Sequence, residues 1–317
     1  MLETVISIGL PVLENMRITK NRLQPKNLNG NEKRICIVTG IHGDELEGQY
    51  VCYKIVKTIN ENFERLKGIV DIYPALNPLG IDSISRGIPM FDLDMNRIFP
   101  GSSDGAFAEQ SANAVINDIM GADMCIDIHS SNIFLTEIPQ VRINENCADI
   151  LVPYAKFLNV DFVWVHSNAT VLESTIAYSL NSRGVPTLVV EMGVGMRITK
   201  TYCDQLVKGI FRLMVEMGIW NDVPQEVKEP ILSKDGKVSF INAEASGIFV
   251  PKISHWSDVK CGDHVGDIVS PLLGEVLHKV VSPCDGKLFT IREYPVVYEG
   301  SLIARILNDA QGGNSNE

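Results

Sequence analysis

The sequence predicts an α/β protein with a mostly parallel sheet flanked by helices, followed by a smaller all-β domain. Up to about residue 220, short apolar runs alternate with segments of helical periodicity, a pattern typical of a sheet covered on both faces. Beyond about residue 228, β-branched runs are interrupted every few residues by Gly, Pro or Asp, without helical periodicity.

The elements of the first part follow from the spacing of its apolar residues. Residues 187–190 are apolar almost throughout, as expected of a strand buried on both faces. Residues 44–66 repeat apolar side chains at helical spacing. A long loop rich in Pro, Gly, Asn and Asp is expected from residue 77 to about residue 105. The expected strands are 34–39, 69–73, 124–128, 161–165 and 187–191, and the expected helices lie near 44–66, 107–120, 146–158, 172–183 and 201–218.

The domain boundary is placed at residue 228, where the composition changes. This gives an α/β domain at 1–228, a β domain at 229–310 and a disordered tail at 311–317. The 317 residues are enough for one large core and a second, smaller domain.

The charge balance bears on the class of partner. With 28 basic and 39 acidic residues, the net charge is −11, whereas nucleic-acid and anionic-membrane surfaces need clustered positive charge. We therefore expect neither nucleic acid nor a membrane as a partner. A small anionic substrate stays compatible with this charge, because a few arginines can dominate one cleft. A homo-oligomer is left open.

The cysteines and the N-terminal segment point to the cytoplasm. Seven cysteines are scattered without paired spacing, so we expect small buried hydrophobes and no disulfide framework. The first residues show neither the basic region nor the apolar run of a signal peptide, and no stretch of about 18 apolar residues suggests a membrane span.

A histidine and a glutamate stand three residues apart directly after the first expected strand, as His42 and Glu45. Where a strand runs into a helix, this spacing lets both side chains point at one ion. His129 follows a distant strand and completes a His2Glu set, the ligand pattern of a catalytic zinc with a fourth position open for water. Each histidine alone is more often an ordinary hydrogen-bonded residue; the two strand-end positions favour the metal site.

Further polar residues fit the same site. Glu191 stands at the expected carboxyl end of a strand, the edge where open α/β sheets bind ligands, and could exchange protons with an activated water and a leaving amine. The alternative is a helix-capping or surface carboxylate. Asp127 precedes His129 by two residues, so both side chains point to the same side of the expected strand. Asp127 could orient the His129 imidazole, or it could be a solvated acid at the end of the strand.

The long loop carries Asn96, Arg97 and Arg86. Guanidinium groups bind carboxylates in a bidentate manner, and an asparagine adds a directional hydrogen bond, so this loop could hold an anionic substrate group. Alternatively, one or both arginines pair with Asp92 or Asp94 and brace the loop. The remaining histidines lack such context and are expected to be structural or exposed: His166, His255, His264 and His278.

Taken together, these segments resemble the succinylglutamate desuccinylase/aspartoacylase family, relatives of the zinc carboxypeptidases. Residues 40–45 resemble the family's first metal motif and residues 92–99, Asp-Leu-Asp-Met-Asn-Arg-Ile-Phe, its substrate-arginine motif. Residues 127–129 resemble the segment with the third ligand, and residues 190–193 the one with the catalytic glutamate. The order agrees, and the resemblance covers roughly residues 34–218.

The resemblance implies a zinc-carboxypeptidase-like mixed sheet and one zinc ion per subunit, bound by His42, Glu45 and His129. It also implies that Glu191 is the general acid/base.

By the same resemblance, Asn96 and Arg97 hold the substrate carboxylate, and Arg86 polarises the scissile carbonyl. Residues 87–91, which follow Arg86, form a longer stretch than in the mammalian aspartoacylases.

The β domain also matches the family, whose members carry such a domain beside the active site. Residues 274–286 look like a biotinyl/lipoyl-type barrel sandwich. A carrier would need a modified lysine at a hairpin tip, and Lys279 lacks the Met-Lys-Met or Asp-Lys-Ala setting. A shield that narrows the cleft and excludes long peptides is the better interpretation.

The predicted function is zinc-dependent hydrolysis of the amide bond of a small N-acyl amino acid, or of a related carboxylate-bearing acyl amine. Metal-activated water would attack the acyl carbon, with Glu191 as general acid/base. The alternatives are a metallocarboxypeptidase acting on small peptides, a non-catalytic small-molecule-binding homologue and a β-domain carrier.

Overall fold

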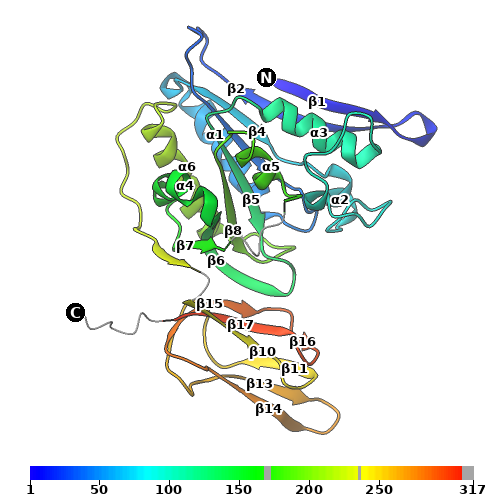
Figure 1. The fold of residues 1–317 in the computed structure, drawn as a ribbon, viewed down its shortest axis with the longest axis vertical. Helices are drawn as coiled ribbons and strands as arrows, with labels where there is room; N and C mark the ends of the chain where they lie inside the picture. The colour runs from blue at the N-terminus through cyan, green and yellow to red at the C-terminus, as the bar shows by residue number, and fades with distance from the viewer. Residues whose placement is uncertain (168–172, 235–236, 309–317) are drawn as a thin grey trace.

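The computed structural model describes residues 1–167, 173–234 and 237–308. Its main feature is a mixed sheet that runs through the middle of the larger part of the molecule (Figure 1). In spatial order its strands are β1 (Leu2–Gly9), β2 (Asn15–Leu23), β4 (Ile69–Tyr73), β3 (Arg34–Thr39), β5 (Met124–Ser130), β8 (Thr187–Gly193) and β6 (Leu135–Asn144). The pairs β4–β3, β3–β5 and β5–β8 are parallel, so the carboxyl ends of the central strands share one edge.

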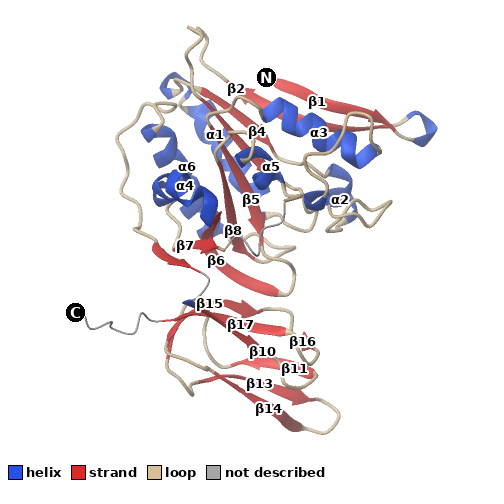
Figure 2. Cartoon of the chain, in the orientation of Figure 1, coloured by secondary structure: helices blue, strands red, loops and turns tan. Residues whose placement is uncertain are grey.

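Helices cover both faces of this sheet (Figure 2). On one face α1 (Glu47–Glu61), α4 (Ala148–Ala155) and α6 (Lys200–Glu216) contribute to one core. On the other face α3 (Phe107–Ile119) and α5 (Ile176–Asn181) pack into a second core. The central strands are buried on both sides, as their continuous apolar runs predict.

The five expected strands and five expected helices are all found, with several helices shorter than expected. The helix expected at 44–66 is α1 followed by a 3-10 turn, Phe63–Arg65. The loop expected from residue 77 contains α2 (Pro78–Ser83) and a 3-10 turn, Met95–Arg97. Residue 172, where one helix was expected to begin, lies outside the described residues.

Three strands of the sheet were not expected: β1, β2 and β6. β2 carries two cations toward Asp71: Arg22 Nη2 lies 2.6 Å and Lys20 Nζ 3.8 Å from Asp71 Oδ2. Because β2 carries these charged side chains, it does not show the apolar pattern of a buried strand, although Lys20 is only 3% exposed. β6 runs antiparallel to β8 and parallel to β7 (Phe162–His166), which makes the sheet mixed.

The C-terminal part consists of short antiparallel strands arranged as two sheets with a common core. One sheet contains β11 (Gly247–Pro251), β13 (His264–Ser270), β14 (Glu275–Val281) and β16 (Val296–Val297). The other contains β10 (Val238–Asn242), β12 (Asp258–Val259), β15 (Gly286–Arg292) and β17 (Leu302–Asn308). Apolar residues of both sheets pack together, which is the sandwich-like arrangement expected.

The two parts are joined by strand pairing as well as by the chain itself. The first residues of β6 pair with β15, so Thr290 lies opposite Glu137 and the main sheet continues into the C-terminal part. β9 (Ile231–Lys234) adds to the edge of β7. The boundary at residue 228 remains a prediction, and the expected tail at 311–317 lies outside the described residues.

Other expectations concern the cysteines and Lys279. All seven cysteines are free, as expected, but Cys261 is exposed, which corrects the expectation that all are buried. Lys279 lies within β14 and not at a hairpin tip, so it lacks the position that a carrier lysine needs. Among the described residues, no helix combines the length and apolar character needed to cross a membrane.

Candidate metal and substrate site

The first two candidate ligands lie in the tight turn between β3 and α1. The Glu45 amide donates to the His42 carbonyl at 3.3 Å, which brings the two side chains to the same side. Gly43 lets this turn pack against α2, because a Cβ atom there would lie 2.0 Å from the carbonyl carbon of Gly80. The Gly43 amide also donates to the Ser85 carbonyl at 3.1 Å, which fixes the ligand turn to the loop that carries Arg86.

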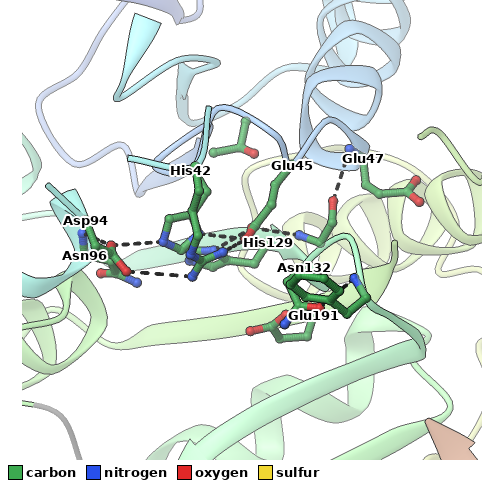
Figure 3. A network of polar contacts seen from close by, with 12 residues as sticks. His42, Glu45, Glu47, Asp94, Asn96, His129, Asn132 and Glu191 are labelled. Carbon is green, nitrogen blue, oxygen red and sulfur yellow. Dashed lines mark hydrogen bonds and ion pairs between the residues drawn. The ribbon is translucent and has the colours of Figure 1, made fainter. Parts of the chain in front are cut away.

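The third candidate ligand, His129, comes from the carboxyl end of β5. The ligand atoms of His42, Glu45 and His129 all lie within 4.8 Å of one another, and all three residues are buried. Figure 3 shows the three side chains converging from the two strand ends. The structure thus brings together the three residues that the sequence pattern selects.

Both histidines are oriented by a carboxylate on the side away from the centre. Asp94 Oδ1 lies 3.1 Å from His42 Nε2, and Asp127 Oδ2 lies 3.1 Å from His129 Nε2. Each histidine therefore presents Nδ1 to the centre. Asp127 is 1% exposed, so the alternative of a solvated acid is wrong. Asp94 lies on the outer side of His42 in Figure 3, a contact that the sequence pattern does not predict.

The donor set fits a divalent metal ion. His42 Nδ1 is buried and lies 2.7 Å from Glu45 Oε1, and His129 Nδ1 lies 3.0 Å from Glu45 Oε2, so both imidazoles and the carboxyl face one point. Burial raises the pKa of the Glu45 carboxyl, but hydrogen bonds and charges at His129 and His42 outweigh it and lower the pKa well below its usual range. Glu45 is therefore a carboxylate, the form that binds a metal, and imidazoles that donate their other ring N–H to a carboxylate are typical metal ligands.

We expect Asp94→Asn and Asp127→Asn each to weaken metal binding by about 10- to 100-fold, because each removes the carboxylate that orients an imidazole. Competition with a chelating dye measures the affinity. Asp92→Asn is the matched control, since Asp92 is exposed in the same loop. Unchanged affinity in both variants, relative to that control, would contradict the orienting role.

Arg86 and Arg97 approach the metal centre from the long loop. Arg86 Nη1 donates to Glu45 Oε1 at 2.8 Å, which places this guanidinium at the edge of the candidate metal site. Arg86 Nη2 and Arg97 Nη2 lie 3.8 and 3.9 Å from Asp94 Oδ2. Pairing with Asp94 therefore does occur. Both arginine side chains nevertheless keep 42% of their surface exposed and line the central cavity.

Asn96 is held by the first residue of α5. Its Oδ1 accepts a hydrogen bond from the Ile176 amide at 3.0 Å, which leaves the Nδ2 group as the donor of this side chain. Asp94 Oδ1 in turn accepts from the Asn96 amide at 2.8 Å. One aspartate thus connects the long loop with the candidate ligand His42.

Glu191 lies beside the metal centre on the neighbouring strand. Its Cα is paired with that of His129 across β5 and β8, so both side chains leave the same face of the sheet. The Glu191 side chain is 17% exposed, and Arg142 Nη1 lies 3.3 Å from its Oε1. Burial raises the pKa of Glu191 above its ordinary value, and the charge of Arg142 opposes the rise.

One cavity of about 310 Å³ connects these residues. Three charged residues that the sequence pattern did not reveal also line it: Glu137 and Arg142 from β6, and Arg305 from β17. Glu137 Oε1 lies 3.1 Å from Arg142 Nη2 and 2.6 Å from Arg305 Nη1, and its Oε2 accepts from Thr290 Oγ1 at 2.8 Å. The C-terminal part therefore supplies one wall of the cavity.

The remaining histidines lie outside the metal centre. His255 Nε2 lies 2.8 Å from the Phe289 carbonyl, and His264 Nε2 lies 2.7 Å from Asp267 Oδ1. The rings of His166 and Trp164 have centroids 4.2 Å apart. These contacts agree with the structural roles expected.

The fold and the candidate metal site are those of a family of metal-dependent deacylases. The chain belongs to the succinylglutamate desuccinylase/aspartoacylase family: the sequence model of that family's catalytic domain matches residues 31–217, more than half of the chain.

Individual relatives agree with this assignment. The chain is 25% identical over 281 residues to an N-alpha-acetyl-L-2,4-diaminobutyric acid deacetylase of Halomonas elongata, covering 84% of this chain and 75% of that protein. The product-bound ectoine utilization protein EutE (DoeB) of Ruegeria pomeroyi has a similar fold, with a TM-score of 0.82 and 19% identity over 96% of this chain and 93% of that one. The structure of a succinylglutamate desuccinylase/aspartoacylase from Rhodobacter sphaeroides is also similar, with a TM-score of 0.81 and 20% sequence identity. The match covers 98% of this chain and 96% of that chain.

Proposed function

We propose that this protein is a zinc-dependent hydrolase that cleaves the amide bond of a small N-acyl amino acid. The observation that carries the proposal is the shared cavity. A buried His2Glu donor set, a partly buried carboxylate and two arginines all line the same 310 Å³ space. That combination suits hydrolysis of an amide that also bears a carboxylate.

Glu191 is the proposed general acid/base. In its ionised form it takes a proton from a water molecule positioned beside the acyl carbon, and the water oxygen bonds to that carbon. The same carboxyl then gives the proton to the nitrogen as the carbon–nitrogen bond breaks, so a carboxylic acid and an amine leave. The raised pKa of Glu191 suits a group that must both accept and release a proton.

The chain's own charges support the reaction around this carboxyl. A zinc ion held by His42, Glu45 and His129 would supply Lewis acidity and lower the pKa of water. Arg86, whose guanidinium is hydrogen-bonded to Glu45, is placed to stabilise the negative charge that develops on the carbonyl oxygen. Because this donor is held by the protein before the reaction, it needs little reorganisation.

Asn96 and Arg97 are the proposed partners of the substrate carboxylate. The guanidinium is exposed to the cavity, and the amide group is held in place by the Ile176 hydrogen bond. Together they offer the directional donors that a carboxylate needs.

For Arg97→Ala we expect the KM of an N-acetyl amino acid to rise about 10- to 100-fold, because a charge-assisted contact is lost. The corresponding N-acetyl amino acid amide, which has no carboxylate, should change much less. Steady-state amine release measures both substrates. Arg17→Ala, at an exposed position of β2, is the control. An equal rise in KM for both substrates would contradict the proposed anion site.

The position of the C-terminal part at the cavity favours small substrates over long peptides. Arg305 and Thr290 anchor Glu137 at the cavity wall, so these strands close one side of the cleft. A metallocarboxypeptidase acting on small peptides is the competing function. A comparison of N-acetyl amino acids with dipeptides and tripeptides tests the proposal, which requires faster release of amine from the N-acetyl compounds.

A further inference from the structure

A second cavity, of about 460 Å³, adjoins the catalytic one. Four residues line both spaces: Arg142, Thr175, Ala177 and Val189. Its volume lies within the range of about 300–1,000 Å³ typical of small-molecule sites. The two cavities therefore adjoin each other, and the residues of the candidate metal site line only the first of them.

The second cavity follows β8 away from Glu191. Side chains two residues apart on a strand share a face, so Glu191, Val189 and Thr187 point to the same side. Glu191 lines the catalytic cavity, Val189 lines both and Thr187 lines only the second. The pairing of β6 with β8 ends at Arg142 and Val189, and beyond it the far wall comes from Cys147 and Leu151 at the start of α4.

The surface of this cavity is mainly apolar, and the polar groups of Asn181 and Thr187 in its wall are hydrogen-bonded within the protein. Asn181 Nδ2 donates to the Thr187 carbonyl at 3.1 Å, and its Oδ1 accepts from the Thr187 amide at 2.9 Å. Thr187 Oγ1 donates to the Val185 carbonyl at 2.9 Å. Among the described residues that line the cavity, Arg142 is the one with a permanent charge, and it already contacts Glu191 and Glu137.

The position of Asn96 indicates which part of a substrate enters. Its Oδ1 is bonded to the Ile176 amide, and the neighbours of Ile176, Thr175 and Ala177, line both cavities. A carboxylate held by Asn96 and Arg97 thus lies beside the opening of the second cavity. In an amino acid the carboxylate and the side chain share one carbon, so the side chain is the group nearest that opening.

We propose that the second cavity binds the side chain of the amino acid released, and that the substrates are N-acyl derivatives of large, uncharged, mainly apolar amino acids. This inference rests on the proposed deacylase function and adds the class of amine. An acidic or basic side chain would lose its hydration on entry without gaining an unpaired partner of opposite charge.

The first test is a substrate panel with the zinc-loaded wild-type protein. We expect kcat/KM for N-acetyl-L-leucine, N-acetyl-L-methionine and N-acetyl-L-phenylalanine to exceed that for N-acetylglycine and N-acetyl-L-aspartate by about 10- to 100-fold. If the glycine, aspartate or diaminobutyrate derivative is the better substrate, the side-chain inference fails while the deacylase function stands. If no N-acyl amino acid is hydrolysed, the proposed function fails, and this inference fails with it.

Two variants that fill the cavity provide the second test. Ala177→Leu adds bulk where the two cavities adjoin, and Cys147→Phe adds bulk to a wall that belongs only to the second cavity. Each should lower the ratio of kcat/KM for N-acetyl-L-phenylalanine to that for N-acetylglycine by at least about 10-fold, because glycine has no side chain to place. Cys261→Phe, at an exposed cysteine outside the cavity, is the matched control and should leave the ratio unchanged.

Binding supplies a readout independent of turnover. In the Glu191→Gln protein, calorimetry should show N-acetyl-L-phenylalanine binding about 10-fold or more tightly than N-acetylglycine, with the difference reduced by Ala177→Leu. Equal binding of the two ligands, or a kcat/KM ratio that neither cavity variant changes, would overturn the proposal.

Discussion

Glu191→Gln should lower kcat for N-acyl amino acid hydrolysis by about 10²- to 10⁴-fold, the usual contribution of a positioned general base. Glutamine keeps the shape of the side chain but cannot accept the proton of the attacking water. Glu191 is not in the His42, Glu45 and His129 donor set, so zinc content should stay near the wild-type value. Steady-state kinetics and metal analysis on the same preparation measure both quantities.

Glu216→Gln is a suitable control for this substitution. Glu216 ends α6 and pairs with Arg212 on the helix surface, away from the cavity. We expect its kcat to match the wild type. Near-normal turnover in Glu191→Gln would exclude Glu191 as the proton carrier, and a loss of zinc in that variant would mean that its activity reports on the metal instead.

His129→Ala should abolish stoichiometric zinc binding and reduce hydrolysis to background. His129 is one of two imidazoles in the donor set, and its removal leaves only His42 and Glu45. It also removes the partner of two buried carboxylates, Glu45 and Asp127, which lie 3.0 and 3.1 Å from its ring nitrogens. We therefore expect a lower melting temperature as well, because buried carboxylates are left with fewer partners.

The matched control for the ligand variant is His264→Ala. His264 lies on β13 in the C-terminal part, where it pairs with Asp267. This variant should keep its zinc and its activity. Circular dichroism of His129→Ala at low temperature separates loss of the ligand from loss of the fold. Full zinc occupancy in a folded His129→Ala protein would show that the ion binds elsewhere.

The parallel core of the fold and the metal ligands were predictable because their signals are local. Buried strands such as β3 and β8 are mainly apolar. His42 and Glu45 follow β3 by a few residues, and His129 lies at the carboxyl end of β5. Carboxyl ends of parallel strands meet at one edge, so residues far apart in the sequence can be placed together. The convergence of His42, Glu45 and His129 follows from that rule.

The missed elements have a different cause. β6 carries Glu137, Gln140 and Arg142, polar residues that belong to a buried network at the cavity. Their presence breaks the apolar pattern from which a strand would be recognised. Arg305 is similar: it comes from a strand of the C-terminal part, and only the pairing of β15 with β6 brings it to the cavity.

Asp94 shows why a carboxylate's role depends on tertiary contacts. In the sequence it stands close to Arg97, and pairing with an arginine is the natural expectation. In the structure it lies near both arginines and also holds His42 Nε2 at 3.1 Å. Which of these contacts matters for the reaction is decided by the position of His42, on a loop about fifty residues earlier.

Metal-dependent cleavage of an N-acyl amino acid is tested directly by one measurement. Primary amine release from N-acetyl amino acids is followed with the wild-type protein as purified, after removal of metal by a chelator, and after zinc is added back. We predict release that disappears with the metal and returns as zinc approaches one ion per chain. Release that is undiminished in the metal-free protein, or no release at one zinc per chain, would contradict the account.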